Sequence, residues 1–333
     1  MHPLAFRYAS VWIEAWGARS AAGDAAATWR SWRSGRSALD PGPPPLGRVD
    51  GLPEDRERIL ALSLAAARPL AAQLGPEPVL ALSASKGDTQ ALFAGNTLPP
   101  AALLEAIPGA LAMRLARSLG IGAHIPVVAV AACSTGLYGL LGAADELARG
   151  RATHGLAGAV DASLQPFVQA GFARLGVLAT AKPNAFTGDG TGFAPAEGAG
   201  FFRLAKSPGP WRLLGGVRLG DACHPTRCAD PAALRRCLDG LWELLPEPDL
   251  IVPHATGTRA GDAYEWAGLQ AGPWRAAQLA PLKPVIGHCL GASGAVELAA
   301  ALESRSRRIW KISLGFGGHI AGVAVERNES MQI

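Results

Sequence analysis

Residues 131–136 have the sequence Ala-Ala-Cys-Ser-Thr-Gly and lie between two segments with different patterns. Small and β-branched side chains at residues 125–132 predict a β-strand, and the apolar spacing of residues 134–149 predicts an amphipathic helix. Cys133 therefore lies at a strand-to-helix turn, where free N–H groups and the positive end of the helix dipole favour a thiolate. The alternative is a buried, inert thiol, which is the commoner state of free cysteine. The turn makes Cys133 a candidate nucleophile of an α/β protein.

Two histidines later in the chain also lie at predicted strand-to-helix junctions. His254 begins the sequence His-Ala-Thr-Gly-Thr directly after the apolar run 250–252. His288 ends the sequence Lys-Pro-Val-Ile-Gly-His at residues 283–288 and precedes Gly-Ala-Ser-Gly. In an open α/β fold the carboxyl ends of the strands meet at one edge, where ligands bind. We therefore expect Cys133 and both histidines to meet in space, although a single histidine is more often structural.

Four motifs in this order resemble those of the β-ketoacyl synthases of the thiolase superfamily, specifically the elongating enzymes with a Cys-His-His triad. The motifs are Cys133 among small residues, His-Ala-Thr-Gly-Thr at 254–258, the Lys-to-His segment at 283–288, and Gly-Phe-Gly-Gly at 315–318. The chain is similar to a short type II or polyketide-like member over almost its whole length. The resemblance implies a thiolase fold, in which two similar βαβαβ-type halves form a five-layered αβαβα core.

Composition and sequence breaks agree with two halves. The chain has 333 residues, 49% of them hydrophobic and 17% charged, which is enough to bury a large core in two domain-sized units. The sequence Ser-Pro-Gly-Pro at residues 207–210 predicts a break. We expect an N-terminal half at residues 1–207 with the nucleophilic cysteine and a C-terminal half at residues 208–333 with both histidines. A βαβ unit at residues 127–160 and a strand at 312–315 fit the α/β assignment, but no sequence repeat is strong enough to show a duplication.

The resemblance implies a decarboxylative Claisen condensation. Cys133 would take an acyl group from a carrier-protein thioester, which splits one difficult step into two. Malonyl thioester would then lose carbon dioxide, and His254 and His288 would donate hydrogen bonds to the enolate oxygen. Backbone N–H groups of Cys133 and Phe316 would hold the oxyanion that forms when the carbanion attacks the acyl-cysteine. The expected activity is that of an acyltransferase of the β-ketoacyl-ACP synthase type, in fatty-acid-like or type II polyketide biosynthesis.

The resemblance also assigns supporting roles. Lys283 would support the second histidine and Glu297 would be the buried carboxylate of the same network, whereas a solvated surface position is the ordinary state of either residue type. Thr256 and Thr258 would hydrogen-bond the phosphopantetheine arm, although both also fit a helix N-cap. Phe316, between glycines that permit unusual backbone conformations, would gate entry of the acyl chain. Its alternative is an apolar residue that closes a tight turn.

The chain departs from the family pattern in three places. The family usually continues with Thr-Asn after the glycines, whereas this chain has His-Ile at residues 319–320. Ala255 replaces the usual glycine. The segment between residues 180 and 192 and the chain before Cys133 are both shorter than in common elongating members. We therefore expect an unusual gate, pocket and partner surface.

The resemblance implies no metal and no redox cofactor, because the substrates are carried on the phosphopantetheine of an acyl carrier protein. It also implies a homodimer, or a heterodimer with a ketosynthase-like subunit. The formal charge of +4 fits an acidic carrier, and two arginine clusters are candidates to steer it, although solvated surface arginines are as common. Neither cluster comes with a nucleic-acid recognition motif, so nucleic-acid binding is not expected. The clusters are Arg30, Arg33 and Arg36, and Arg305, Arg307 and Arg308.

Other features restrict location and metal binding. The apolar runs are too short to span a bilayer, and Glu14 and Arg19 interrupt the N-terminal segment, so we expect no membrane span and a cytoplasmic protein. Five cysteines, an odd number, favour reduced thiols over a disulfide scaffold. The sequence Cys-His-Pro-Thr-Arg-Cys at 223–228 supplies three zinc ligand types without a fourth, so a structural zinc site is not expected.

Two alternative functions stay open. A non-elongating acyl transferase or thioester hydrolase would use Cys133 without release of carbon dioxide. A chain-length-factor-like partner subunit would shape the pocket of another synthase, but such subunits typically lack the cysteine. A discrete ketosynthase is the leading prediction.

Overall fold

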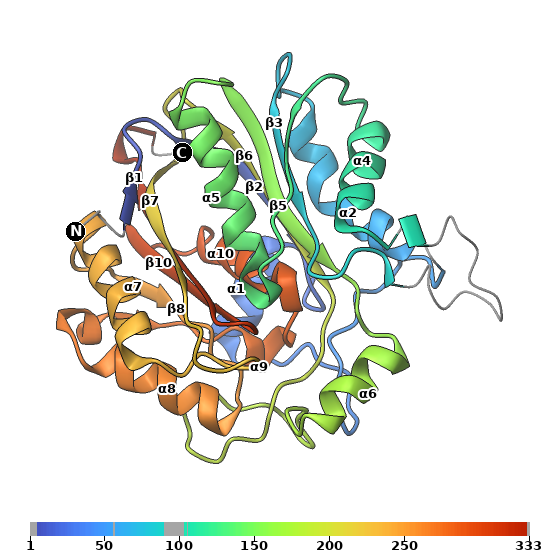
Figure 1. Cartoon of the computed structure of the whole chain (residues 1–333), viewed down its shortest axis with the longest axis vertical. Helices are drawn as coiled ribbons and strands as arrows, with labels where there is room; N and C mark the ends of the chain where they lie inside the picture. Colours follow the sequence, from blue (N-terminus) through green and yellow to red (C-terminus); the bar gives the residue numbers. More distant parts are fainter. Residues whose placement is uncertain (1–4, 56, 90–102, 105, 332–333) are drawn as a thin grey trace.

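The computed structural model describes residues 5–55, 57–89, 103–104 and 106–331. Its main sheet has the strand order β4-β3-β5-β6-β2-β7-β11-β10-β8-β9, and β1 pairs with β7 outside this path (Figure 1). The strands are β1 (Ala5–Arg7), β2 (Trp12–Arg19), β3 (Val79–Ser83), β4 (Ile125–Val127), β5 (His154–Asp161), β6 (Gly198–Ala205), β7 (Trp211–Gly220), β8 (Leu250–Val252), β9 (Gln278–Leu279), β10 (Arg308–Gly315) and β11 (His319–Arg327).

Helices connect most of these strands. The α-helices are α1 (Ala25–Ser34), α2 (Arg58–Ala71), α4 (Pro108–Ser118), α5 (Thr135–Ala148), α6 (Pro166–Arg174), α7 (Pro231–Leu244), α8 (Arg259–Gln270), α9 (Lys283–Ile286) and α10 (Ser293–Ala301). Short 3₁₀ helices are η2 (Ala132–Ser134), η3 (Pro273–Ala276), η4 (Leu290–Ala292) and η5 (Glu329–Met331).

The sheet contains the same arrangement twice. From its centre outwards the strands run β2-β6-β5-β3-β4 on one side and β7-β11-β10-β8-β9 on the other. On both sides the first two pairings are antiparallel and the last two are parallel. Each half thus repeats one chain order and one set of strand directions, a duplication that the sequence alone did not reveal.

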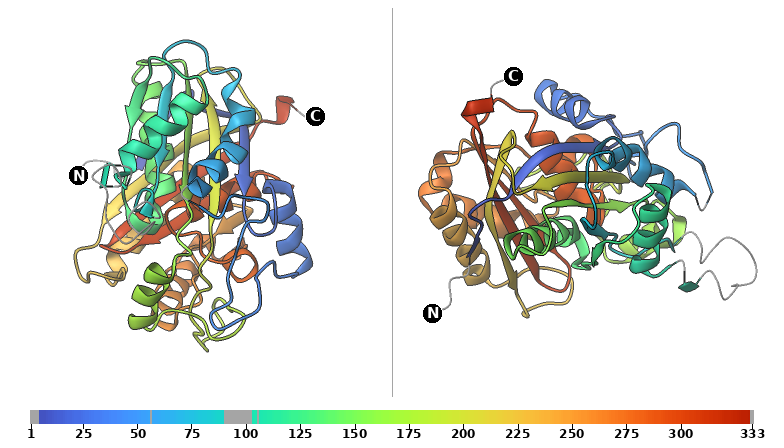
Figure 2. Two further views of the ribbon diagram at one scale, coloured as in Figure 1. Left: turned by 90° about the vertical axis from the view of Figure 1, so that its right-hand side faces the viewer. Right: turned by 90° about the horizontal axis from the view of Figure 1, so that it is seen from above.

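The two halves stack as five layers of the thiolase fold, as expected. Helices α5 and α10 contact each other and lie between the halves, with α5 against β5 and β3 and α10 against β6 and β2. Helices α2 and α4 cover the outer face of one half, and α7 covers the other half with α8 packed beside it (Figures 1 and 2). Every residue of α10 is buried, which is typical of a helix in the centre of a large core.

Small residues let the central helices approach their neighbours. A Cβ added at Gly136 of α5 would lie 3.0 Å from the backbone nitrogen of Ala295, and one added at Gly139 would lie 3.1 Å from the Ser83 hydroxyl. Leucines on α5, such as Leu137 and Leu140, fill the remaining space and are fully buried. The glycines of α5 therefore allow close packing against the neighbouring elements, and this packing positions the turn at Cys133.

Two of the predicted elements lie close to their observed bounds. The predicted helix 134–149 and the predicted strand 250–252 correspond to α5 and β8. The predicted strand 125–132 is wrong in extent, because β4 ends at Val127. β4 has one neighbour in the sheet and pairs with it over three residues, after which the chain turns to bring Cys133 to the end of the sheet.

The boundary predicted at 207/208 falls between β6, which ends at Ala205, and β7, which begins at Trp211. We retain it as a proposal for the division of the chain, with β1 as an N-terminal strand that joins the opposite half through β7. Within the described ranges, no helix combines the length and apolarity needed to cross a membrane.

Candidate active site

The nucleophile turn is held by its own backbone and one threonine. Ala132 has φ of +46°, in the left-handed region, and Cys133 follows it in η2. The Thr135 hydroxyl donates to the Ala132 carbonyl at 2.7 Å and accepts from the Ala131 N–H at 2.9 Å. These bonds fix the sharp change of direction from β4 into α5, so that the thiol lies at the carboxyl end of the sheet.

His254 is placed by a buried glutamate. The two oxygens of Glu265 accept the backbone N–H groups of His254 at 2.6 Å and Ala255 at 2.7 Å. Ala255 has φ of +45°, where glycine would be free of strain. The departure from the family pattern at this position therefore keeps the left-handed turn, at a cost of roughly 1 kcal/mol in backbone strain.

His288 is fixed through its ring and its backbone. Its Nδ1 lies 2.8 Å from the Ser293 hydroxyl, and its backbone N–H donates to the Ala194 carbonyl at 2.7 Å. The ring packs edge-on against Phe193, with centroids 5.1 Å apart, and against His254, with centroids 5.3 Å apart. The two histidines predicted to meet are therefore in direct ring contact.

A chain of buried charges lies behind the histidines. Lys283 donates to the His254 carbonyl at 2.5 Å and lies 2.7 Å from Glu297, whose other oxygen lies 2.8 Å from Lys311. Lys311 also donates to the Pro253 and Ile312 carbonyls, at 3.1 Å and 2.6 Å. Sequence reasoning missed Lys311, although a lysine inside the apolar strand Ile-Trp-Lys-Ile was the available signal.

The site holds its histidines neutral. Burial, helped by the charge of Lys283, lowers the pKa of both His254 and His288 well below its usual range. Each ring therefore carries one N–H at neutral pH, as a hydrogen-bond donor to a developing negative charge needs. Burial also raises the pKa of Glu265 to about 7, although its two backbone N–H donors oppose this.

The predicted thiolate preference of Cys133 is wrong for the free protein. Burial raises the pKa of the thiol to about 11, although the charges of Lys86 and Lys283 and the Phe316 N–H lower it. Desolvation of the anion thus outweighs the helix dipole and the nearby cations. The thiol form prevails at neutral pH.

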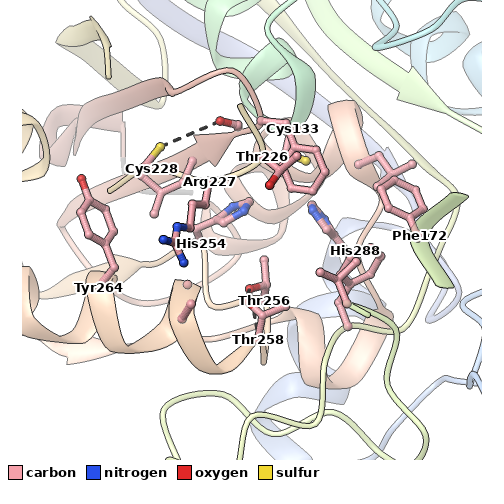
Figure 3. A pocket seen from close by; sticks show the side chains of 18 of the residues that line it. Cys133, Phe172, Thr226, Arg227, Cys228, His254, Thr256, Thr258, Tyr264 and His288 are labelled. Atoms are coloured by element: carbon pink, nitrogen blue, oxygen red, sulfur yellow. Dashed lines mark hydrogen bonds between the residues drawn. The ribbon is translucent and has the colours of Figure 1, made fainter. Parts of the chain in front are cut away.

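Cys133, His254 and His288 line one cavity of about 250 Å³ (Figure 3). Thr256 and Thr258 line it as well, with their hydroxyl oxygens 2.9 Å apart. Figure 3 shows the three predicted reactive side chains around one space, with the two threonines drawn below them. Phe316 is also among the lining residues, whereas Lys283 and Glu297 are buried and do not line the cavity. Lys283 contacts the backbone of His254, the first of the two histidines, and Glu297 contacts Lys283.

The predicted gate packs among aromatic rings. Phe316 is half-buried and lies edge-on to Phe172, with centroids 6.3 Å apart. Gly318 has φ of +76°, and a Cβ there would collide with the Asp221 carbonyl. The His319 ring stacks edge-on with Tyr138 at 5.7 Å, and Ile320 is a fully buried core residue. His319 thus links β11 to α5, Ile320 packs in the core, and neither of these two residues lines the cavity.

The segment between β7 and α7 adds residues that sequence reasoning gave no role. His224, Arg227 and Cys228 line the cavity (Figure 3). The segment is fixed by Asp221, whose carboxylate accepts the backbone N–H groups of Cys223, Ala229 and Asp230. Burial raises the pKa of Asp221, but three backbone N–H groups and the Cys223 side chain lower it to about 2. Among the described residues no cluster of His, Cys, Asp and Glu suits a metal ion, and all five cysteines are free thiols.

One predicted arginine cluster lies away from the cavity. Arg307 and Arg308 are at the start of β10, whereas Gly315 at its other end lines the cavity. An eight-residue strand spans about 25 Å. Both arginines pair with glutamates: Arg307 with Glu329, and Arg308 with Glu247 and Glu326. Arg307 and Arg308 therefore lie at the other end of β10 from the residue that lines the cavity. Arg30, Arg33 and Arg36, on or after α1, are exposed.

Comparisons with known proteins agree with this geometry. Residues 80–207 match the family described as "Beta-ketoacyl synthase, N-terminal domain", and residues 221–316 match "Beta-ketoacyl synthase, C-terminal domain". The chain is 33% identical to nodulation protein E of Rhizobium leguminosarum bv. trifolii over 201 residues, which are 56% of this chain and 50% of that protein. It is 32% identical to a putative polyketide beta-ketoacyl synthase of Streptomyces virginiae over 218 residues, 59% of this chain and 51% of that protein.

Solved structures show the same fold. A complex of a type II PKS acyl-carrier protein with its ketosynthase bound to the hexaketide matches 97% of this chain and 100% of the compared chain, with a TM-score of 0.83 and 20% identity. The ishigamide ketosynthase/chain length factor matches with the same coverage and TM-score at 19% identity. The chain spans about half the length of the curated relatives it matches.

Proposed function

Because the chain belongs to the β-ketoacyl synthase family, we propose that it catalyses the decarboxylative condensation of an acyl thioester with malonyl-ACP. The acyl group is carried on Cys133 between the two half-reactions. The observation that carries this proposal is the cavity that brings the Cys133 thiol together with two neutral imidazoles, those of His254 and His288.

In the first half-reaction the Cys133 thiolate attacks the carbonyl carbon of the acyl thioester. A new carbon–sulfur bond forms, and the carrier thiol leaves with the proton that Cys133 lost. The Phe316 N–H already donates toward the Cys133 sulfur, and together with the Cys133 N–H it is suited to hold the oxyanion of the tetrahedral intermediate.

In the second half-reaction the malonyl thioester loses carbon dioxide, and the electron pair of the broken bond forms an enolate. His254 and His288 donate to the enolate oxygen. The Ser293 hydroxyl lies 2.8 Å from Nδ1 of His288. A hydrogen bond donated by this hydroxyl to Nδ1 would leave the single ring N–H on Nε2, which supports this role. The α-carbon then attacks the acyl-Cys133 carbonyl, and collapse of the intermediate releases the cysteine thiolate and the β-ketoacyl thioester.

The remaining predicted residues have supporting positions. Thr256 and Thr258 line the cavity, where their hydroxyls suit the amides of a phosphopantetheine arm. Lys283 holds the backbone of His254, Glu297 holds Lys283, and both act as positioning residues. The reaction exchanges no electrons with a cofactor and forms carbon dioxide as its leaving group, so we propose no metal and no redox cofactor.

A paired subunit is part of the proposal. β4 is an edge strand, and after it Val128 and Val130 are 46% and 52% exposed. An edge strand followed by exposed apolar residues calls for a covering partner. We propose a second copy of this chain or a ketosynthase-like subunit there, an acyl carrier protein at the cavity mouth, and a cytoplasmic location, where free thiols stay reduced.

The test is mass spectrometry of the protein mixed with acyl-ACP and malonyl-ACP, in the wild type, Cys133→Ala, His288→Ala and the control Cys223→Ala, which removes an exposed thiol. We expect a Cys133-dependent acyl adduct and a His288-dependent product two carbons longer with release of carbon dioxide. An adduct without elongation would instead establish the transferase or hydrolase. No adduct, with or without a ketosynthase-like subunit present, would establish a partner-subunit role.

A further inference from the structure

A lysine outside the cavity lies beside the nucleophile turn. Lys86 follows β3, which pairs in parallel with β4 on one side and β5 on the other. Parallel strands end at the same edge of a sheet, so the chain after β3 lies between the segments that lead to Cys133 and to Asp161. Lys86 is not among the residues that line the cavity.

Gly291 brings the two segments into contact. A Cβ added there would lie 2.8 Å from the Ser85 Cβ, 3.0 Å from the Ser85 nitrogen and 3.3 Å from the Ala132 carbonyl oxygen. The residue before Lys86 and the residue before Cys133 thus pack against the same glycine. The Gly291 N–H also lies 3.4 Å from an Asp161 oxygen, so one turn contacts all three segments.

The Lys86 ammonium is anchored. Its nitrogen donates to the Ser85 hydroxyl at 2.8 Å and lies 3.5 Å from Asp161. Asp161 is 2% exposed and accepts further hydrogen bonds from the Ser85 and Ser163 hydroxyls. The Lys86 side chain is 32% exposed, so it holds its charge in place without the full cost of burial.

We propose that the Lys86 ammonium, anchored by Ser85 and Asp161, is a positioning group that stabilises the Cys133 thiolate. This inference rests on the proposed function in one respect, namely that Cys133 is the nucleophile. The thiolate is the attacking species, so a nearby cation raises the fraction of Cys133 that can react. Sequence reasoning assigned Lys86 no role.

Charges around the thiol support the assignment. Burial raises the Cys133 pKa, and among the charges that lower it Lys86 acts most strongly, ahead of the fully buried Lys283, while Asp161 acts in the opposite direction. Lys86 also contributes to the lowered pKa of His288. Several charged or titratable groups act on Cys133 or line the same cavity. They are Lys86 after β3, Asp161 of β5, His224, Arg227 and Cys228 between β7 and α7, His254 after β8, Tyr264 of α8, Lys283 of α9 and His288 after α9.

The test measures alkylation of Cys133 by iodoacetamide in the full chain between pH 7.0 and 9.5. Peptide mass spectrometry gives the rate at Cys133 relative to the exposed Cys223 in the same molecule. We expect Lys86→Met to lower this ratio about 3- to 10-fold at each pH, because each unit of pKa changes the thiolate fraction tenfold. Lys86→Arg keeps the charge and should retain most of the ratio, and Asp161→Asn should raise it.

Lys206→Met is the matched control. Lys206 follows β6 beside the start of β5, at the end of the sheet away from Asp161, so its loss should leave the ratio unchanged. An unchanged ratio in Lys86→Met would overturn the proposal, as would an equal fall in Lys86→Met and Lys86→Arg. Lys86→Met decides the outcome even if Asp161→Asn fails to fold. The assay contains no carrier substrate, so it separates this proposal from a failure of condensation.

Discussion

The two halves of the molecule contain the same turn with different chemistry. Residues 132–136, Ala-Cys-Ser-Thr-Gly, and residues 290–294, Leu-Gly-Ala-Ser-Gly, each form a 3₁₀ helix that leads into a central helix. The first residue of each turn is left-handed, with φ of +46° at Ala132 and +44° at Leu290. Cys133 in one turn therefore corresponds to Gly291 in the other.

The difference lies in what each turn holds. The Thr135 hydroxyl forms its hydrogen bonds within its own turn, whereas the hydroxyl of the equivalent Ser293 is bonded to the ring of His288. The glycine in place of the cysteine leaves space for the Ser85 segment to pack. The same backbone turn thus presents the proposed nucleophile in the N-terminal half and supports an imidazole in the C-terminal half, so the proposed function depends on side chains placed on a duplicated scaffold.

The largest expected effect comes from loss of the side chain that distinguishes the two turns. Cys133→Ala should lower condensation by about 10⁴-fold or more, because it removes the proposed acyl acceptor. The product is followed by mass spectrometry. Cys289→Ala, which removes a thiol just before the other turn, is the control. Retention of elongation in Cys133→Ala would show that the acyl group is carried elsewhere.

Removal of a charged side chain should lower the free energy of unfolding more in the C-terminal half, at Glu297, than in the N-terminal half, at Lys86. Glu297→Gln leaves Lys283 and Lys311 without their shared counter-ion in the core, so we expect a loss of about 3–5 kcal/mol in the free energy of unfolding. Lys86→Met removes a partly exposed charge and should cost less than about 1 kcal/mol. Urea unfolding monitored by circular dichroism measures the free energy of unfolding of both variants. Equal losses in the two variants would contradict the expected difference between the two halves.

Removal of the Ser293 hydroxyl should mainly affect catalysis, whereas removal of the Thr135 hydroxyl should mainly affect stability. Ser293→Ala removes the partner of His288 and should slow condensation about tenfold, which corresponds to about 1.4 kcal/mol, with little effect on acylation of Cys133. Thr135→Ala removes two turn bonds and should lower the free energy of unfolding by about 1–2 kcal/mol. Single-turnover acylation and condensation assays, with unfolding curves, distinguish these results from a common structural defect.

The neutral histidines predict acid sensitivity. The folded-state pKa of His288 lies well below 6.5, so below pH 6.5 the unfolded chain binds a proton that the folded chain does not, and stability falls with pH. The expected cost at pH 5.5 is about 1.4 kcal/mol for this residue. Glu265 acts in the opposite direction between about pH 7 and 4.5, because its folded-state pKa is raised.

His288→Asn isolates the contribution of this ring. The fall in unfolding free energy between pH 7.5 and 5.5 should be about 1.4 kcal/mol smaller in the variant than in the wild type. His124→Asn removes a histidine that does not line the cavity and is the control. An identical pH dependence in wild type and His288→Asn would mean that the ring is protonated in the folded state.

The smallest effect concerns the left-handed residues. Ala132→Gly should stabilise the protein by about 0.5 kcal/mol, because relief of left-handed strain slightly exceeds the added entropy of the unfolded chain. Ala255→Gly, with φ of +45° in the wild type, should behave in the same way. Thermal unfolding of both variants measures this, and destabilisation at either position would mean that the methyl group contributes more through packing than strain costs.

Much of the fold followed from local patterns. The helix after Cys133 and the strand before His254 were predicted because their periodicity is strong and their residues are buried on the expected faces. The extent of β4 was not predictable, since residues 128–131 have strand-like composition but no neighbour in the sheet beyond three pairs. Pairing depends on the other strand, which the local pattern does not contain.

The candidate site divides in the same way. Cys133, His254 and His288 were found because each stands in a motif, and they do line one cavity. The strand-to-helix junction predicted at His288 is wrong, because residues 283–286 form the helix α9. Lys86 and Lys311 were missed, since a single lysine carries no local sign of what it faces. The predicted thiolate failed because the helix dipole is a local property, whereas desolvation of the sulfur depends on the whole surrounding core.

By itself the sequence determined the α/β class, the family motifs and the reactive side chains within them, because periodicity and turn chemistry are properties of neighbouring residues. Tertiary structure alone decided the duplication of the sheet, the matched turns at 132–136 and 290–294, and the charges that face the thiol and the imidazoles. These depend on contacts between residues far apart in the chain, where burial and distance set both proton affinity and geometry.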